Sequence, residues 1–349
     1  MKNLPKSAVK EQYLLRSTFF YKRLSANGYF NLFLKVQKYS DIEGATLEWD
    51  KRRLWGISNE AWDILNQNNI SPILLFVHPK VLYTNPSFLK YYRSVAMIPK
   101  KGLKSITGIS NVDSIENGKV EAQKLSKDTI NNLVNAINEI LSLVIVMASN
   151  INKKEIEGMM YATAGTNIDG SWRNQIGYEG ERVIRTIILK GLDSCQEITS
   201  VIDKDNMTHK WGTPESIALS SDIDKIKTIN LVNGCSVLFA SEPDVTMCDS
   251  DGSILGIIEI KSGLDPAGAL ERLGAMLKSF VNTLSEYPRA VTILVASCIT
   301  KELDSRLNAS MAVRQRYITA DITSNDREKR KFVNKLRVIL KLEKNNSIS

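Results

Sequence analysis

Three charged residues lie within the segment SEPDVTMCDSDGSILGIIEIKSG, which runs from Ser241 to Gly263. Asp244 follows a proline, and Glu259 and Lys261 stand two residues apart in an apolar run. Mg²⁺ prefers oxygen ligands, usually one or two carboxylates together with water and substrate phosphate oxygens. Two carboxylates and one ammonium group can therefore hold Mg²⁺ and activate a water molecule, as phosphodiester hydrolysis requires.

The residues around this trio predict a strand pair that would bring the charges together. Residues 252–263 are rich in Ile and bounded by glycines, which is typical of a buried strand, and residues 250–253 have the composition of a turn. The preceding residues predict a second strand that ends near Asp244. Because side chains alternate along a strand, Glu259 and Lys261 share one face, and the turn returns Asp244 to them.

Each member of the trio has an expected role. Asp244 and Glu259 would supply metal-binding carboxylates, and the carbonyl of Ile260 a further oxygen. Lys261 would orient or deprotonate the attacking water, or balance charge on the transition state. A purely structural alternative has Asp244 capping a turn while Glu259 and Lys261 pair on an exposed strand face. The apolar residues 254–260 argue for burial instead, and burying charge without a function is costly.

Pro243, Asp244, Glu259 and Lys261 resemble the motif of the PD-(D/E)xK nuclease superfamily. This resemblance implies a mixed α/β fold with a restriction-endonuclease-like core, in which helices flank a central mixed sheet. It also implies nuclease activity that depends on Mg²⁺.

A predicted helix upstream extends the resemblance. Residues 174–191 read NQIGYEGERVIRTIILKG, and their apolar residues recur at helical spacing. Nucleases of this superfamily often carry a glutamate on the helix that precedes the sheet. Gly180 and Glu181 fit that pattern at the expected first turn of the helix, so Glu181 would complete the site, with Glu179 as the alternative carboxylate.

The residues downstream predict a strand–helix–strand unit. Asp265 and Pro266 are typical of a helix start, apolar residues at helical spacing follow, and residues 290–299 read as a further strand. The segment HPKVLYTNPSFLKYYRSVAMIPKKG, from His78 onward, resembles a segment of several restriction enzymes in which a YYR-type helix is followed by lysines. The phrase LDPAGALER downstream of the trio resembles type II restriction endonucleases of the XcyI kind. That resemblance suggests a G·C-rich hexamer of base pairs as the recognition site.

The overall composition suits a globular protein with a polyanionic partner. The 349 residues carry a net charge of +8, with a pI of about 9.1. Residues 1–40 contain eight Lys or Arg against Glu11 alone, and residues 311–349 contain ten against four acids. Both ends are therefore candidate contacts for DNA phosphates, although solvated basic faces would give the same composition.

Several other classes of function are disfavoured. The four cysteines form no CxxC pair, and there are only two histidines, so a zinc site and a histidine mechanism are not expected. Residues 1–15 lack an apolar core of signal-peptide length, and the most apolar stretch, residues 140–148, is too short to span a membrane. We therefore expect a cytoplasmic protein with reduced cysteines and no membrane contact.

The chain is expected to fall into three regions. Residues 1–165 read as mainly helical, for DNA recognition or dimerisation, residues 166–300 as the nuclease core, and residues 301–349 as a basic helical segment. The stretch from Tyr161 to Arg173 reads as a loop between the first two. Six basic residues are candidate DNA contacts: Arg173, Lys210, Arg272, Lys278, Lys100 and Lys101.

Together these features predict a type II restriction endonuclease. It would cut double-stranded DNA at a short palindrome and leave 5′-phosphates, and a homodimer would cut both strands because each chain has one site. A DNA methyltransferase encoded nearby would be its functional partner. The alternatives are a structure-specific or repair nuclease of the same superfamily and a non-catalytic DNA-binding protein on that fold.

Overall fold

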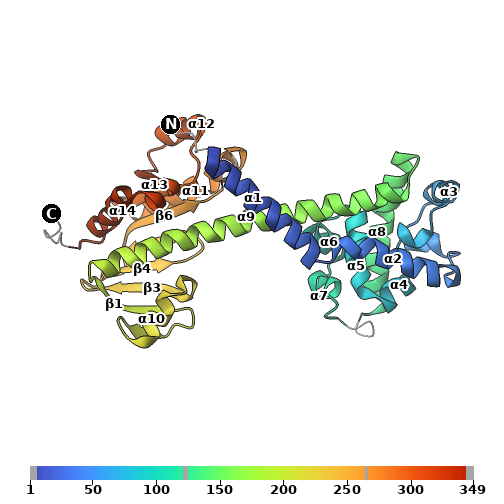
Figure 1. The fold of residues 1–349 in the computed structure, drawn as a ribbon, viewed down its shortest axis with the longest axis horizontal. Coiled ribbons are helices and arrows are strands. Elements are labelled where there is room, and N and C mark those ends of the chain that lie inside the picture. Colours follow the sequence, from blue (N-terminus) through green and yellow to red (C-terminus); the bar gives the residue numbers. More distant parts are fainter. Residues whose placement is uncertain (1–5, 121–124, 264–265, 343–349) are drawn as a thin grey trace. The chain divides into compact units, whose positions relative to one another are not determined.

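The computed structural model describes residues 6–120, 125–263 and 266–342, apart from the side chains of residues 6–9, 11, 12 and 266–273. The chain forms two compact units, residues 3–172 and residues 173–349, and the division falls inside helix α9 (Lys153–Ser194) (Figure 1). We had placed the first boundary at residue 165. Residues 301–342, which we had treated as a separate segment, belong to the second unit.

The second unit is built on an eight-stranded mixed sheet with the order β2-β1-β3-β4-β5-β6-β7-β8. Neighbouring strands from β2 through β6 are antiparallel, and β6, β7 and β8 are parallel. This arrangement confirms the predicted α/β fold with a restriction-endonuclease-like core. The strands are β1 (Ile198–Asp203), β2 (Thr208–Lys210), β3 (Ile226–Leu231), β4 (Ser236–Phe239), β5 (Val245–Cys248), β6 (Ile254–Lys261), β7 (Val291–Ala296) and β8 (Gln315–Ile318).

Helices cover both faces of this sheet. Ile258 and Ile260 of β6 pack into a core with apolar residues of α9, α13 and α14, whereas Ile257 packs with residues of α11 and α12 on the other face. The predicted strand–helix–strand unit is present as β6, α11 and the parallel strand β7. The remaining helices are α10 (Pro214–Ser220), η6 (Ile223–Lys225), α11 (Pro266–Glu286), α12 (Lys301–Ala309), α13 (Thr319–Ser324) and α14 (Asp326–Ile339).

The strand pair β5–β6 forms the hairpin predicted from the sequence. Its turn is held by the Asp249 side chain, whose Oδ1 accepts hydrogen bonds from the backbone N–H groups of Asp251 (3.1 Å) and Ser253 (2.9 Å). Gly252 adopts a left-handed φ of 82° in this turn, a conformation that glycine reaches without strain. The turn sets the register in which Val245 opposes Ile258.

The first unit is helical, as predicted. Its longest complete helices are α8, capped by the Ser126 hydroxyl, and α1. Length and composition alone would let α8 cross a membrane, but one of its faces, with Leu133, Ile137 and Leu141, is buried in the core. The elements are α1 (Lys6–Ala26), α2 (Tyr29–Glu43), η1 (Gly44–Thr46), η2 (Arg52–Trp55), α3 (Asn59–Gln67), η3 (Pro72–Leu74), α4 (Pro79–Thr84), η4 (Pro86–Phe88), α5 (Leu89–Val95), α6 (Lys100–Thr107), α7 (Val112–Glu116), α8 (Lys127–Ala148) and the first part of α9.

A buried ion pair in this unit could not be foreseen from the sequence. Arg93, in the YYR stretch, is fully buried and donates hydrogen bonds to both carboxylate oxygens of Glu116 and to the carbonyl of Ile98. Glu116 lies in a stretch of the sequence that is rich in polar and turn-forming residues. Its burial on α7 satisfies the Arg93 guanidinium, as a buried charge requires.

Two predictions of local structure were wrong. Residues 161–173 are not a loop but part of α9, because Ala164 is buried in the helical core, Ile168 is also buried, and the Thr163 hydroxyl donates to the carbonyl of Ser94. The helix therefore tolerates its glycines, each of which costs roughly 1 kcal/mol. The C-terminal region is not all helical either, because residues 315–318 add strand β8 beside β7. The predicted helix cap at Asp265 lies outside the described residues.

Candidate active site

Asp244 and Glu259 face each other across the β5–β6 hairpin. Asp244 directly precedes Val245, which opposes Ile258, so the register places Asp244 beside Glu259. Asp244 Oδ2 accepts a hydrogen bond of 2.6 Å from the backbone N–H of Ile260, which fixes the carboxylate at the end of β6. The predicted proximity of the two carboxylates is therefore present. The peptide bond between Glu242 and Pro243, just before Asp244, is cis.

Lys261 joins the two carboxylates. Its Nζ donates to Glu259 Oε2 at 2.7 Å and lies 3.6 Å from Asp244 Oδ2. Asp244 and Glu259 are each only 4% exposed, whereas Lys261 is partly exposed. The alternative of an exposed Glu259–Lys261 pair on a strand face is therefore wrong. The three charges form one buried cluster at the strand end.

The cluster carries two negative charges against one positive charge, and the pKa values reflect this. Burial raises the pKa of Asp244 to about 6, and the charges of Glu259 and Glu181 add to the rise, while Lys261 opposes it. Burial alone would lower the pKa of Lys261, but the attraction of Asp244, Glu259 and Glu181 raises it above the ordinary lysine value. Lys261 is consequently an ammonium ion at neutral pH.

Helix α9 approaches the end of β6 at Gly180. A Cβ atom on Gly180 would lie 1.6 Å from the hydroxyl oxygen of Ser262, so only glycine permits this approach. The close contact places Glu181 where its charge acts on both Asp244 and Lys261. We had expected Gly180 and Glu181 in the first turn of a helix, but they lie deep inside α9.

Glu181 rather than Glu179 belongs to this site. Glu179 has a side chain that is 50% exposed, accepts a hydrogen bond from Gln175 and lies 4.0 Å from Arg182. Glu181 is half-buried and accepts a hydrogen bond of 2.8 Å from Arg185. The helix thus presents one glutamate to the cluster and the other away from it.

Arg185 is a residue of the site that sequence reasoning missed. Its Nη2 donates both to Glu181 and to the carbonyl of Ala240, at 2.9 Å, in the segment between β4 and Asp244. The guanidinium also lies over the ring of Phe239. Its position four residues after Glu181, on the same helical face, was the available indication. Arg185 therefore ties the helix carboxylate to the segment that carries Asp244.

The residues fit a hard divalent cation. Glu259 Oε1 is buried without a hydrogen-bond partner within the described part of the chain, which leaves an acceptor for a cation. Over the same residues, no three His, Cys, Asp or Glu side chains are placed to hold a metal by themselves. Asp244 and Glu259 would therefore bind the ion together with backbone, water or substrate oxygens, as is usual for Mg²⁺.

The candidate DNA contacts lie on several elements of the two units. Lys100 and Lys101 belong to the helical unit, where Lys100 pairs with Asp113 at 2.6 Å. Lys210 lies exposed on the edge strand β2, and Lys278 is exposed on α11. Arg173 lies in α9 at the division between the units, and the side chain of Arg272 lies outside the described residues.

A mixed sheet between helices, with a buried carboxylate–carboxylate–lysine cluster at a strand end, defines a protein with a restriction-endonuclease-like core. The family model of the XcyI restriction endonuclease matches residues 56–342, which is most of the chain. The chain therefore belongs to the XcyI restriction endonuclease family, whose members are nucleases that act on DNA. A search of curated proteins found no match.

Proposed function

We propose that this chain is a Mg²⁺-dependent type II restriction endonuclease. It hydrolyses phosphodiester bonds of double-stranded DNA at a short specific site and leaves 5′-phosphates. The observation that carries the proposal is the buried cluster of Asp244, Glu259 and Lys261, with Lys261 Nζ at 2.7 Å and 3.6 Å from the two carboxylates. Membership of a restriction endonuclease family makes DNA the expected substrate.

Each residue has a role in this reaction. Asp244 and Glu259 would hold Mg²⁺ together with the carbonyl of Ile260, and the ion would supply Lewis-acid polarisation of the phosphate and a more acidic water. Lys261 donates hydrogen bonds, which suits it to orient the attacking water and to balance charge in the transition state. The water oxygen bonds to phosphorus in line and gives up a proton to solvent, while the bond from phosphorus to the 3′ oxygen breaks and that oxygen takes a proton to become the 3′-hydroxyl.

The carboxylates around Lys261 determine its protonation before the ion binds. Because they raise its pKa, the side chain of the metal-free protein is an ammonium group that donates hydrogen bonds. Glu181, held by Arg185, supports the site from α9.

Cleavage of both strands calls for two copies of this site. The chain has one such cluster among its described residues, so a homodimer with two-fold symmetry would cut a palindrome symmetrically. A methyltransferase encoded nearby would protect host DNA in the cytoplasm. A structure-specific nuclease and a non-catalytic DNA-binding protein are the alternatives, and the complete Asp–Glu–Lys set disfavours the second.

Digestion of phage or plasmid DNA distinguishes these functions. Purified protein is incubated with the DNA and Mg²⁺, and the products are separated on a gel and tested for ligation. Discrete fragments that religate without prior phosphorylation are expected, because specific cleavage leaves 5′-phosphates. A smear would indicate a nuclease without sequence specificity, and a mobility shift without fragments would indicate binding alone.

A further inference from the structure

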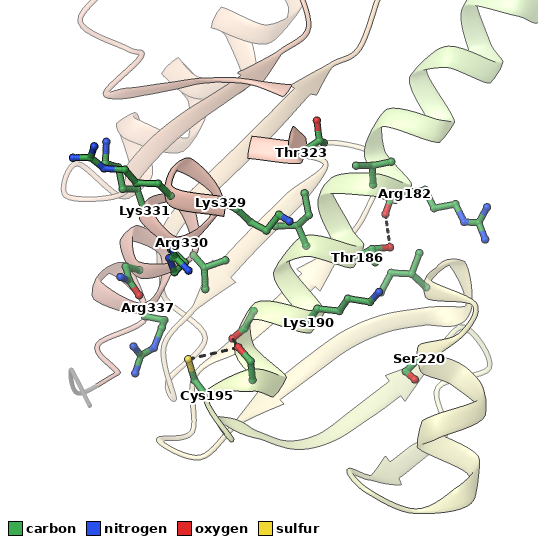
Figure 2. A pocket seen from close by; sticks show the side chains of 18 of the residues that line it. Arg182, Thr186, Lys190, Cys195, Ser220, Thr323, Lys329, Arg330, Lys331 and Arg337 are labelled. Carbon is green, nitrogen blue, oxygen red and sulfur yellow. Dashed lines mark hydrogen bonds between the residues drawn. The ribbon is translucent and has the colours of Figure 1, made fainter. Parts of the chain in front are cut away.

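A groove of about 1540 Å³ lies on the second unit, apart from the catalytic cluster (Figure 2). Its walls are the later part of α9, the helices α13 and α14, and the Ser220–Ile223 region. Asp244, Glu259 and Lys261 are not among its lining residues. Arg182, which lines the groove, directly follows Glu181, the residue of α9 whose charge acts on the cluster.

The groove is strongly basic. Six basic residues line it, and Glu179 is the acidic residue among those that line it. A seventh basic residue, Arg337, is buried and bound to Glu197. The six are Arg182, Lys190, Arg327, Lys329, Arg330 and Lys331. Figure 2 shows two of them, Arg182 and Lys190, on α9, and three others on α14: Lys329, Arg330 and Lys331.

Half of these charges are not neutralised within the described residues. Arg182, Lys329 and Lys331 pair with Asp224, Asp326 and Glu328 at 3.5 Å, 3.2 Å and 2.6 Å. Lys190, Arg327 and Arg330 are exposed, and over the part of the chain that the structure describes none of them lies within salt-bridge distance of an acidic side chain. Their charges are therefore available to an external anion.

The stability of helix α14 explains Lys329 and Lys331, which form i,i+3 pairs with acidic residues, but not Arg327 and Arg330. Arg327 and Arg330 lie in the first two turns of α14, towards the end where the helix dipole makes positive side chains unfavourable. Their charge adds to the positive end of the helix instead of offsetting it. The arrangement is electrostatically unfavourable for the isolated helix, but it would attract a polyanionic partner.

We propose that this groove binds the phosphate backbone of duplex DNA beyond the bond that is cut, an inference that rests on the proposed DNA cleavage. Lys190 lies eight residues after Arg182 on α9, a rise of about 12 Å, which spans several phosphates of one strand. Such contacts read no bases, so the groove adds affinity for DNA of any sequence.

The test replaces the three unpaired cations together. The variant Lys190→Gln/Arg327→Gln/Arg330→Gln is compared with the matched control Lys204→Gln/Arg289→Gln/Lys301→Gln, whose three basic residues are exposed on other parts of the same unit. Binding of a labelled random-sequence duplex is measured by fluorescence anisotropy without divalent metal, over a series of salt concentrations.

The groove variant should bind on the order of a hundredfold more weakly at 0.1 M salt, and the slope of log K against log salt should become shallower by about 2–3. The control variant should match the wild-type protein. An unchanged slope and affinity in the groove variant, or an equal loss in the control, overturns the groove inference while wild-type DNA cleavage stands. A wild-type protein that neither binds nor cuts DNA overturns the proposed function as well.

Discussion

At the scale of single residues, the cluster of Asp244, Glu259 and Lys261 is an arrangement that opposes folding. Two carboxylates that are 4% exposed share one ammonium group, and burial raises the pKa of Asp244 to about 6. Lys261 compensates only part of the repulsion. A buried charge that is incompletely paired destabilises the folded state, so its presence indicates a function rather than a structural role.

Replacement of Asp244 by Asn should therefore stabilise the protein in the absence of divalent metal. The folded pKa of about 6 exceeds the ordinary value of 3.8, so the native state favours the protonated carboxyl, and stability is lost as the pH rises from about 4 through 6. The gain for Asp244→Asn should be about 1–3 kcal/mol at pH 8 and should shrink towards pH 4.5. Thermal unfolding in a chelator at both pH values measures it, and a gain that does not depend on pH would contradict this origin.

The two neighbouring glutamates of α9 provide a matched pair. Glu181→Gln should slow single-turnover DNA cleavage about 10–100-fold, because the charge of Glu181 acts on Asp244 and Lys261. Glu179→Gln, on the exposed side of the helix, should stay within about twofold of the wild-type rate. Equal effects of the two substitutions would remove Glu181 from the site.

At the scale of elements, the sequence predicted the helices and strands that local sequence patterns specify. The β5–β6 hairpin, the strand β6 and the unit β6–α11–β7 follow from alternation, turn residues and helical spacing. The continuity of α9 did not follow, because burial of Ala164 and Ile168 overrides the local preference of its glycines and polar residues. Strand β8 forms because residues 315–318 pair with β7, and the local sequence gives no signal for this pairing.

The distinction between local sequence patterns and non-local contacts also applies to the candidate site. Asp244, Glu259 and Lys261 were predicted because all three lie on one hairpin. Arg185 was missed because its partner, the carbonyl of Ala240, is distant in sequence. The exact place where α9 meets β6 depends on the Gly180–Ser262 contact, which is also non-local.

The surroundings of two glycines of α9 predict different effects of substitution by alanine. Gly180→Ala should destabilise the protein by about 2–4 kcal/mol, because the new Cβ would overlap the Ser262 side chain. Gly177→Ala meets no atom within 4 Å and should be neutral or stabilise by up to about 1 kcal/mol. Chemical denaturation measures both changes.

A second substitution controls for the cause. Adding Ser262→Gly to Gly180→Ala removes the atoms that clash, so it should recover part of the lost stability. A Gly180→Ala variant as stable as the wild-type protein would show that α9 does not approach β6 so closely.

At the scale of the whole molecule, one unit carries the catalytic cluster and the basic groove, and the other is a helical unit around a large apolar core. The proposed cleavage of both strands requires two chains of 39.1 kDa. Sedimentation equilibrium should therefore give about twice the mass of one chain for the free protein, or two chains plus one duplex for its complex with site-containing DNA. If one chain bound to DNA cut both strands at once, the proposed dimer would be contradicted.

The most direct measurement is the rate of Mg²⁺-supported DNA cleavage by Asp244→Ala and Lys261→Ala, beside the exposed controls Asp205→Ala and Lys204→Ala. Each substitution in the cluster should lower the single-turnover rate by at least about a hundredfold, because it removes a carboxylate or the ammonium from the reacting site. The controls should cut at the wild-type rate. Undiminished discrete cleavage by Asp244→Ala or Lys261→Ala would show that the catalytic site lies elsewhere.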